Sequence, residues 1–430
     1  MKQKRQIVIV GGGWGGCGAA EAAVRAGAQV TLLERADMLL GTGLVGGIFR
    51  NNGRQTAAEE MTALGMKMFS VMDSVTRHRN VSFPGHEGAS LYDVYAMEPA
   101  VKAFLADLGV DVALQASVAS IERAKDRITS VTTRDGRCFG ADAVVDATGT
   151  SAAPANCNSH GRGCAMCILR CHSFLPRTSV TALAGIEEWN GAKADGSLGA
   201  MSGSCKLFKE SLDPSIVAEL NETGVCLVPL PDELREDLSI LGAKACQQYA
   251  RKEFVENLVL LDTGPAKLMT PYFPLEALRR IPGFERARYE DPIAGGKGNS
   301  MRYFGFARCD TTLRAQGEVT NLFCAGEKAG AMVGHTEAIV TGALAGRNAV
   351  AVALGLEPTA YPEELALGDF IAHVIPLMAT EEGRRFKYTF SGSVYFERMK
   401  EKGLYITDGP AVARRVDEKG LTGFFKRKLA

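Results

Sequence analysis

The residues best suited to hold a metal are four cysteines in one short segment. Cys157, Cys164, Cys167 and Cys171 follow the pattern C-x6-C-x2-C-x3-C. Iron–sulfur clusters need several thiolates in a small volume, and the last three cysteines have the spacing of the C-terminal part of a bacterial ferredoxin motif. The pattern favours a [4Fe–4S] cluster acting as an electron relay. Structural zinc is one alternative, and a metal-free redox pair of Cys164 with Cys167 is another.

The first turn of the chain has the composition of a dinucleotide-binding loop. The β-branched run Ile7–Val10 is typical of a strand buried on both faces. The glycines that follow give G-x-G-x-x-G: Gly11 permits a tight turn, Gly13 lets the backbone approach a pyrophosphate, and Gly16 allows close helix packing. The whole loop is therefore predicted to contact a cofactor: Gly11, Gly12, Gly13, Trp14, Gly15 and Gly16.

The elements after this loop complete a βαβ unit. The sequence predicts a helix over Cys17–Arg25 and a second strand over Gln29–Leu33, which ends in Glu34. The helix N-terminus offers free N–H groups to phosphates, and a carboxylate at Glu34 can accept hydrogen bonds from ribose hydroxyls. Glu34 and its neighbour Arg35 are predicted to bind the ADP half of the cofactor.

Later strands indicate which dinucleotide binds. The strand Ala141–Asp146 ends in Ala-Thr-Gly, and the strand Asn321–Cys324 runs into Ala-Gly-Glu. Together with the first loop, this order resembles the two-dinucleotide-binding-domain flavoproteins of the glutathione-reductase type. The resemblance implies FAD, with Glu327 at the ribityl chain where that superfamily commonly has Asp. The further contacts it implies are Val118, Thr148, Gly149 and Gly326.

A closer resemblance rests on three stretches of sequence. The runs Gly43–Ile48, Glu59–Gly65 and Leu322–Ala349 are similar to the glucose-inhibited division protein A family of FAD proteins. The resemblance implies FAD binding that includes Gly46 and Gly47. It does not carry over the tRNA-modifying activity of that family, because Thr42 lies in the loop where the family has a cysteine. The C-terminal part is also too short for the family's long helical region that meets tRNA.

His335 is the histidine whose position best fits catalysis. It lies just after Gly334, at the start of a Gly/Ala-rich helical stretch. In the resembled superfamily this helix points its N-terminus at the flavin pyrimidine edge, where free N–H groups stabilise negative charge on the reduced ring. We predict that His335 donates to the flavin or moves a substrate proton near neutral pH. A structural histidine bonded to backbone is the alternative.

Length and composition limit the possible classes of protein. The 430 residues exceed a single core, and 49 Lys and Arg balance 49 Asp and Glu, so no global field favours nucleic acid or a membrane. The early first strand leaves no room for a signal peptide. The apolar stretch Ala331–Leu356 contains Glu337 and Arg347 and is predicted to be a buried helix rather than a membrane span. Eleven cysteines without an export signal indicate a reducing, cytoplasmic location.

The predicted fold class is α/β. A Rossmann-like FAD-binding domain is expected from residues 1–155 and 310–358, at both ends of the chain. An inserted mixed α+β domain, residues 156–309, would carry the cysteine cluster and the substrate site, and residues 359–430 would form a short helical region. Leu234–Asn257 is predicted to be helical, and the basic end Phe424–Lys428 is predicted to be a docking or dimer contact.

These features predict an FAD-dependent oxidoreductase that acts on a small molecule, with the cysteine cluster relaying electrons. Flavin-dependent tRNA modification is one alternative, and a non-enzymatic electron carrier or redox sensor is another. No second G-x-G-x-x-G follows a strand, so NAD(P)H would approach the flavin directly, or an electron-transfer protein would supply electrons. Nucleic acid is not an expected partner, and a homodimer is a candidate assembly.

Overall fold

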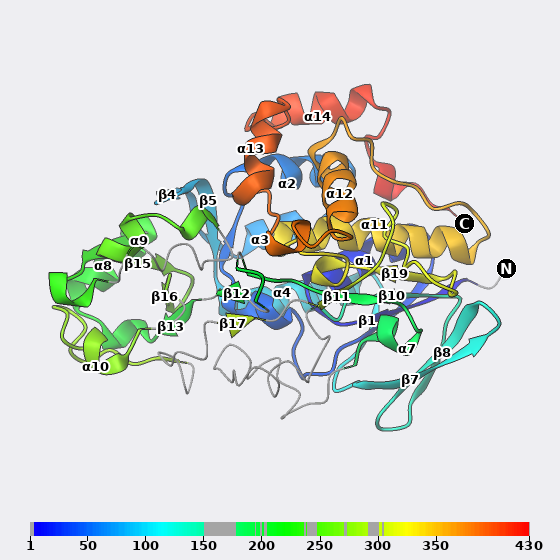
Figure 1. Ribbon diagram of the computed structural model, residues 1–430, viewed down its shortest axis with the longest axis horizontal. Helices are drawn as coiled ribbons and strands as arrows, with labels where there is room; N and C mark the ends of the chain where they lie inside the picture. Colours follow the sequence, from blue (N-terminus) through cyan, green and yellow to red (C-terminus); the bar gives the residue numbers. More distant parts are fainter. Residues whose placement is uncertain are drawn as a thin grey trace.

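The computed structural model describes residues 4–149, 178–193, 195–197, 200–201, 204–235, 238, 247–270, 273–290, 301–302 and 305–429. Its centre is a five-stranded parallel sheet in the order β19-β10-β1-β2-β6 (Figure 1). Strands from both ends of the chain pair side by side, since Val144 of β10 aligns with Val8 of β1 and with Leu322 of β19. This confirms the predicted Rossmann-like α/β fold. The strands are β1 (Gln6–Val10), β2 (Gln29–Leu33), β6 (Asp111–Ala113), β10 (Ala143–Asp146) and β19 (Leu322–Cys324).

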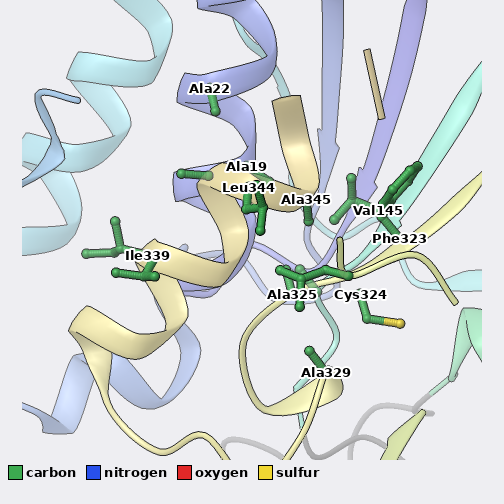
Figure 2. Close-up of a cluster of buried hydrophobic side chains, with 14 of the residues drawn as sticks. Ala19, Ala22, Val145, Phe323, Cys324, Ala325, Ala329, Ile339, Leu344 and Ala345 are labelled. Carbon is green, nitrogen blue, oxygen red and sulfur yellow. The ribbon is translucent and has the colours of Figure 1, made fainter. Parts of the chain in front are cut away.

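Two helices, α1 (Trp14–Arg25) and α11 (His335–Ala353), lie against each other beside this sheet. Their backbones approach closely, because a Cβ on Gly342 would lie 2.0 Å from the carbonyl oxygen of Gly15. A Cβ on Gly346 would lie 2.2 Å from the oxygen of Ala19. The close contact fixes the start of α11 relative to the glycine loop. Figure 2 shows the small and branched side chains that fill this core: Ala19, Ala22, Val145, Phe323, Ile339, Leu344 and Ala345.

Two antiparallel sheets and three helices flank the central sheet. One sheet has the order β7-β8-β9, and the other has the order β3-β5-β4. The strands of these sheets are β3 (Ile48–Phe49), β4 (Thr76–Phe83), β5 (His86–Tyr92), β7 (Val118–Ala124), β8 (Arg127–Thr133) and β9 (Cys138–Gly140). The helices nearby in the sequence are α2 (Gly53–Ala63), α3 (Met68–Ser74) and α4 (Val94–Asp107).

The inserted part contains a four-stranded antiparallel sheet in the order β13-β16-β15-β14. It buries its own hydrophobic cluster, which includes Leu207, Leu260 and Phe284. The predicted helix over Leu234–Asn257 is wrong for the described residues, which form only short helical turns there. The elements are β13 (Cys205–Leu207), α8 (Pro214–Thr223), β14 (Val225–Pro229), α9 (Glu253–Glu256), β15 (Asn257–Asp262), β16 (Ala266–Leu268) and α10 (Leu275–Leu278).

Short elements complete the described part of the chain. They are α7 (Val180–Leu183), the pair β11 (Glu188–Asn190) and β18 (Gly305–Ala307), and the pair β12 (Ala200–Met201) and β17 (Met301–Arg302). The 3-10 turns are η1 (Gly41–Val45), η2 (Lys209–Ser211), η3 (Asp232–Leu234), η5 (Gln247–Tyr249), η7 (Gly326–Lys328), η8 (Gly383–Arg385) and η9 (Phe424–Lys426).

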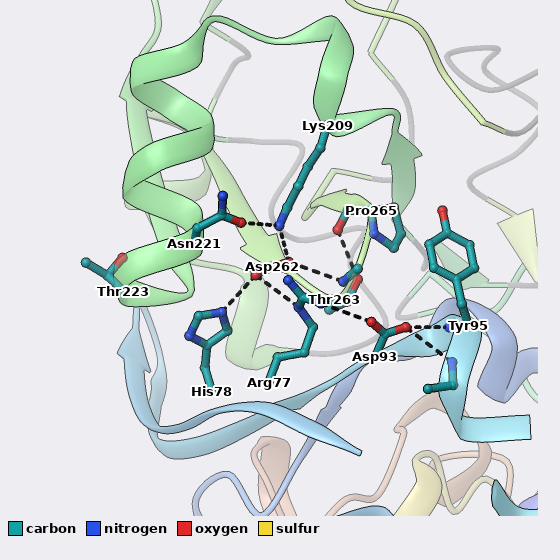
Figure 3. Close-up of polar contacts among 12 residues, drawn as sticks. Arg77, His78, Asp93, Tyr95, Lys209, Asn221, Thr223, Asp262, Thr263 and Pro265 are labelled. Atoms are coloured by element: carbon teal, nitrogen blue, oxygen red, sulfur yellow. Dashed lines mark hydrogen bonds and ion pairs between the residues drawn. The ribbon is translucent and has the colours of Figure 1, made fainter.

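A buried carboxylate joins the inserted sheet to the β4–β5 hairpin. Asp262, at the end of β15, has no exposed surface and accepts hydrogen bonds from Arg77 Nε at 3.1 Å and His78 Nε2 at 2.8 Å (Figure 3). Lys209 Nζ lies 2.6 Å from its other oxygen. Burial alone would raise the pKa of Asp262, but the bonds from Lys209 and His78 and the charges of Lys209 and Arg77 hold it below its usual value. The two parts of the chain are therefore held together by charge as well as by apolar contacts.

The C-terminal part is helical, as predicted, and most of it lies above α11 in the view of Figure 1. Its last turn packs into the chain itself: Phe425 is fully buried, and the guanidinium of Arg347 lies 4.1 Å from the ring centroid of Phe424. These two aromatic residues therefore make an intramolecular contact, while residues 426–428 are exposed, and the docking role of this segment stays a prediction. Among the described residues, no helix is long and apolar enough to cross a membrane. The helices are α12 (Ala366–Leu377), α13 (Ser393–Glu401) and α14 (Gly409–Glu418).

Candidate functional site

The glycine loop between β1 and α1 forms a tight turn with one open side. Gly11 has φ +105° and lies so close to the end of β10 that a Cβ would be 2.4 Å from the Ala147 oxygen. A Cβ on Gly16 would lie 1.9 Å from the oxygen of Gly11. Gly13 differs, because a Cβ there would meet no atom within 4 Å. Two glycines therefore shape the turn, and the third leaves free space in front of the N-terminus of α1.

Glu34 lies at the end of β2 and faces this loop. Its carboxylate accepts hydrogen bonds from Gly12 N at 2.7 Å and Ala36 N at 2.8 Å. The segment leading into β7 runs beside it, since Ala116 N donates to the Glu34 carbonyl oxygen at 2.8 Å. Val118, two residues on, is 3% exposed and packs into the main core. The predicted ADP-side residues thus lie around one edge of the sheet, with Arg35 directly after Glu34.

The carboxyl ends of β10 and β19 border the same loop. At the end of β10, Asp146 accepts hydrogen bonds from Thr148 N at 3.1 Å and Oγ1 at 2.6 Å, and Gly149 follows with φ +65° and open space at its Cβ position. At the end of β19, the backbone nitrogen of Gly326 lies 3.2 Å from where a Cβ on Gly15 would be. Glu327 follows in η7 and is partly exposed. The sheet thus brings the predicted ADP-side and ribityl-side residues to one edge.

His335 is the first residue of α11 and lies among aromatic rings. Its ring centroid is 5.6 Å from that of Trp14 and 5.8 Å from that of Tyr92, and Tyr92 Oη is 3.4 Å from His335 Nδ1. Gly46 touches the imidazole, because a Cβ there would lie 2.0 Å from Cε1. The side chain of His335 therefore meets the segment that contains Gly46 and Gly47. Sequence reasoning missed Tyr92, which has no motif around it.

The pKa of His335 bears on its predicted role. Burial, together with the positive charges of Arg54 and Lys267, lowers this pKa to about 3, although a hydrogen bond with the Ile48 backbone acts in the opposite direction. The imidazole is therefore neutral near pH 7 and has one N–H donor. The low pKa argues against the predicted movement of a proton near neutral pH, and the hydrogen bond with the Ile48 backbone agrees with the alternative of a structural histidine.

A buried ion pair supports the start of α11. Arg54 Nε lies 3.1 Å from both carboxylate oxygens of Glu337, which is fully buried. Glu337 also accepts from Thr389 Oγ1 at 2.6 Å and Phe390 N at 2.8 Å. Sequence reasoning missed Arg54; the signal available was Glu337 itself, a carboxylate in an apolar helical stretch that needs a buried partner.

Two observations indicate that these residues fit FAD. The open side of Gly13 leaves room for a pyrophosphate at the N-terminus of α1, where backbone N–H groups and the helix dipole favour anions. At the N-terminus of α11, Thr336 Oγ1 is buried without a hydrogen-bond partner among the described residues, which suits a ligand with a polar edge.

A second buried histidine gives a prediction about acid stability. His86 is 2% exposed and stacks on Phe83 at 4.5 Å, and its pKa is lowered to about 3 by burial and by the charges of Arg54 and Arg251. The unfolded chain binds this proton below about pH 6.5. The free energy of unfolding should therefore fall between pH 6.5 and 3, by about 1.4 kcal/mol per pH unit for this group.

Urea unfolding at pH 7, 6, 5 and 4 measures this slope. His86→Phe, which keeps an aromatic ring between Phe83 and Tyr249, should give a shallower dependence on pH than the wild type. Equal slopes for the two proteins would contradict the assignment to His86.

The predicted metal ligands Cys157, Cys164, Cys167 and Cys171 lie outside the described residues. Within the part of the chain that the structure describes, no group of three or more His, Cys, Asp or Glu side chains could hold a metal ion. The structure therefore gives no support to a metal centre elsewhere in the described residues.

Comparison with known proteins bears on this site. Residues 6–224 and 267–357 match the family model described as glucose inhibited division protein A. Among solved structures, GidA from Aquifex aeolicus is similar in two crystal forms. Form II has a TM-score of 0.63 at 15% identity, over 97% of this chain and 76% of that chain. Form I has a TM-score of 0.58 at 15% identity, over 97% and 79%.

At this identity the solved structures show a shared fold, which agrees with the sheet described above. The family match extends over well over half of the chain, agrees with the resemblance seen in the sequence, and supports FAD as the cofactor of an FAD-dependent enzyme. The chain belongs to the glucose-inhibited division protein A family.

Proposed function

We propose that this chain is an FAD-dependent oxidoreductase whose flavin ring binds between the segment around Gly46 and the N-terminus of α11. One observation carries the proposal, namely the open space beside Gly13. This space lies at the N-terminus of α1 and next to the ends of β2, β10 and β19. FAD supplies two-electron transfer, and the chain's own residues bind and orient it. Glu34 bonds the ribose, Glu327 reaches the ribityl chain, and His335 donates a hydrogen bond near the pyrimidine edge.

The spectrum of the purified protein tests the proposal. A bound flavin should give the two visible absorption bands of oxidised FAD, and dithionite should bleach them. Protein that is folded but binds no FAD, even after addition of excess cofactor, would refute the proposal.

The substrate class has two candidates. Family membership favours the first, flavin-dependent tRNA modification, over oxidation of a small molecule. Two features of this chain support the second: the loop Gly41-Thr42-Gly43 offers no thiol where the family has a cysteine, and the formal net charge is zero. Binding of bulk tRNA at several salt concentrations separates them. RNA modification requires binding that weakens steeply with salt, whereas a small-molecule enzyme should bind tRNA no better than an unrelated neutral protein.

Replacement of His335 by Asn should leave flavin content normal and slow flavin reduction or reoxidation by about tenfold, the effect of losing one hydrogen bond. The pH dependence between 5 and 8 should not change, because the wild-type imidazole is already neutral there. Stopped-flow absorbance of each half-reaction measures this. Wild-type rates in both half-reactions would mean that His335 is structural.

The four-cysteine segment is a separate part of the proposal. If Cys157, Cys164, Cys167 and Cys171 bind one metal centre, each single Cys→Ser change should sharply lower the iron or zinc content of anaerobically purified protein. Acid-labile sulfide distinguishes an iron–sulfur cluster from zinc. Cys138→Ser is the control, because Cys138 is exposed and lies outside the segment. Stoichiometric metal in all four variants would rule out a shared site.

A further inference from the structure

The turn that joins β15 to β16, residues 263–265, packs against the N-terminus of α4. Thr263 is buried, and its carbonyl oxygen accepts a hydrogen bond at 3.0 Å from the backbone N–H of Val94, the first residue of α4. A Cβ on Gly264 would lie 3.1 Å from Oδ1 of Asp93, the residue that caps this helix. The inserted sheet therefore meets the flavin-binding part of the chain at this turn.

The same turn lies directly against the segment that we propose to meet the flavin. A Cβ on Gly47, which has φ +90°, would be 2.3 Å from Thr263 Cγ2. The carbonyl oxygen of Gly47 accepts a hydrogen bond from Tyr92 N at 3.0 Å, and Gly46 touches the imidazole of His335. The methyl group of Thr263 therefore closes one side of the segment whose next contacts are Tyr92 and His335.

A buried carboxylate holds the turn in this position. Asp262, the last residue of β15, is ionised near pH 7, since its pKa is below the usual value. Its Oδ1 accepts hydrogen bonds from Lys209 Nζ at 2.6 Å and from Gly264 N at 3.2 Å (Figure 3). Its Oδ2 accepts from Arg77 Nε at 3.1 Å, and Arg77 Nη1 also donates to Asp93 Oδ2 at 3.0 Å. One carboxylate thus ties the turn to the inserted part, to β4 and, through Arg77, to the start of α4.

We propose that this turn is a positioning element of the flavin site, in which Asp262 anchors the turn and the methyl group of Thr263 sets the position of Gly47. The proposal rests on the proposed function where it concerns FAD. Glycine has wide conformational freedom, and a methyl group packed beside it limits the movement of its backbone. A ligand binds more tightly to a segment that is already held in its bound position, because less ordering remains to be done on binding.

Two substitutions of Thr263 test the methyl contact. Thr263→Ser removes Cγ2 and keeps the hydroxyl, whereas Thr263→Val keeps the methyl group and loses a hydroxyl whose bond to the Pro265 oxygen is long, at 3.4 Å. The rate of FAD release from the purified holoprotein, followed by flavin fluorescence after dilution, should rise about tenfold in Thr263→Ser. It should stay within about threefold of the wild type in Thr263→Val. A rise below threefold in Thr263→Ser, or an equal rise in both variants, overturns the proposal.

Asp262→Asn tests the anchor. It keeps the size of the side chain but removes the negative charge that faces Lys209 and Arg77, and FAD release should become at least about threefold faster. Asp369→Asn is the matched control, because Asp369 is also fully buried and paired with two cationic side chains, but lies on α12. It should release FAD at the wild-type rate. Equal rates in these two variants overturn the anchoring role, and if Asp262→Asn does not fold, the Thr263 variants decide.

Amide hydrogen exchange in flavin-free protein separates this proposal from the proposed function. Exchange of the Tyr92 N–H reports how firmly Gly47 is held, because it donates to the Gly47 carbonyl oxygen. Relative to the amides of β1, it should be at least about threefold faster in Thr263→Ser and Asp262→Asn than in the wild type, and unchanged in Thr263→Val and Asp369→Asn. If the wild type binds no FAD, the proposed function fails while these rates still test the positioning. Equal relative rates in the variants and the wild type overturn it.

Discussion

Replacement of Gly13 by valine is expected to give a folded protein that carries no FAD. Gly13 precedes α1 with φ −69° and ψ −179°, values that valine adopts without strain, and its Cβ position is open. The substitution therefore leaves the packing of the chain unchanged. In the proposed complex the same space is the path of the pyrophosphate, so an isopropyl group there excludes the cofactor.

The ratio of flavin absorbance to protein absorbance measures the loss, and circular dichroism shows whether the fold is kept. Gly140→Val is the matched control, because Gly140 also has open space at its Cβ position but lies at the end of β9. It should retain full flavin. Gly16→Val should fail to fold, since its Cβ would lie 1.9 Å from a backbone oxygen. Full flavin occupancy in Gly13→Val would show that the glycine loop does not bind the pyrophosphate.

Replacement of Arg54 by methionine should lower the free energy of unfolding by about 3–5 kcal/mol, the usual cost of leaving a buried charge without its partner. Glu337 is fully buried, and Arg54 Nε contacts both of its oxygens at 3.1 Å. Without the guanidinium, the carboxylate keeps only its bonds from Thr389 and Phe390, and its buried charge loses its counter-charge.

Urea denaturation at pH 7 measures the change. The exposed pair Lys419–Glu364 provides the control, since Lys419→Met should leave the free energy of unfolding nearly unchanged. Glu337→Gln added to Arg54→Met should recover part of the loss, because it removes the uncompensated charge. A change below 1 kcal/mol in Arg54→Met would mean that the ion pair contributes little to the fold.

The parts of this structure that could be predicted from sequence are those determined by residues that lie close together in the chain. Strand β2 has the predicted bounds Gln29–Leu33, because a short run of mostly apolar residues after Gly27 is a local signal. The contact between Arg54 and Glu337 joins residues 283 positions apart, and no local pattern encodes it. The same holds for the contact between Lys267 and Val45. Lys267 lies on β16 and Val45 in the η1 turn, and the two meet only after the inserted part has folded.

Burial also changed one prediction of chemistry. The residue type of His335 suggests a proton carrier near pH 7, but the surrounding rings and the positive charges lower its pKa. The sequence shows that residue 335 is a histidine, but it does not show that the imidazole is buried or that positive charges lie near it. At the end of the predicted helix over Leu234–Asn257, Asn257 instead begins β15 and aligns with Pro229 of β14, a pairing that no local pattern encodes.

The central sheet has a consequence for how the chain is made on the ribosome. Strand β19 pairs with β10, although the whole inserted part lies between Val144 and Leu322 in the chain. Until β19 has emerged, β10 is an unprotected edge and the glycine face of α1 lacks α11. The central sheet therefore cannot close until the last quarter of the chain is being made, and until then the β10 edge is open to pairing with other chains.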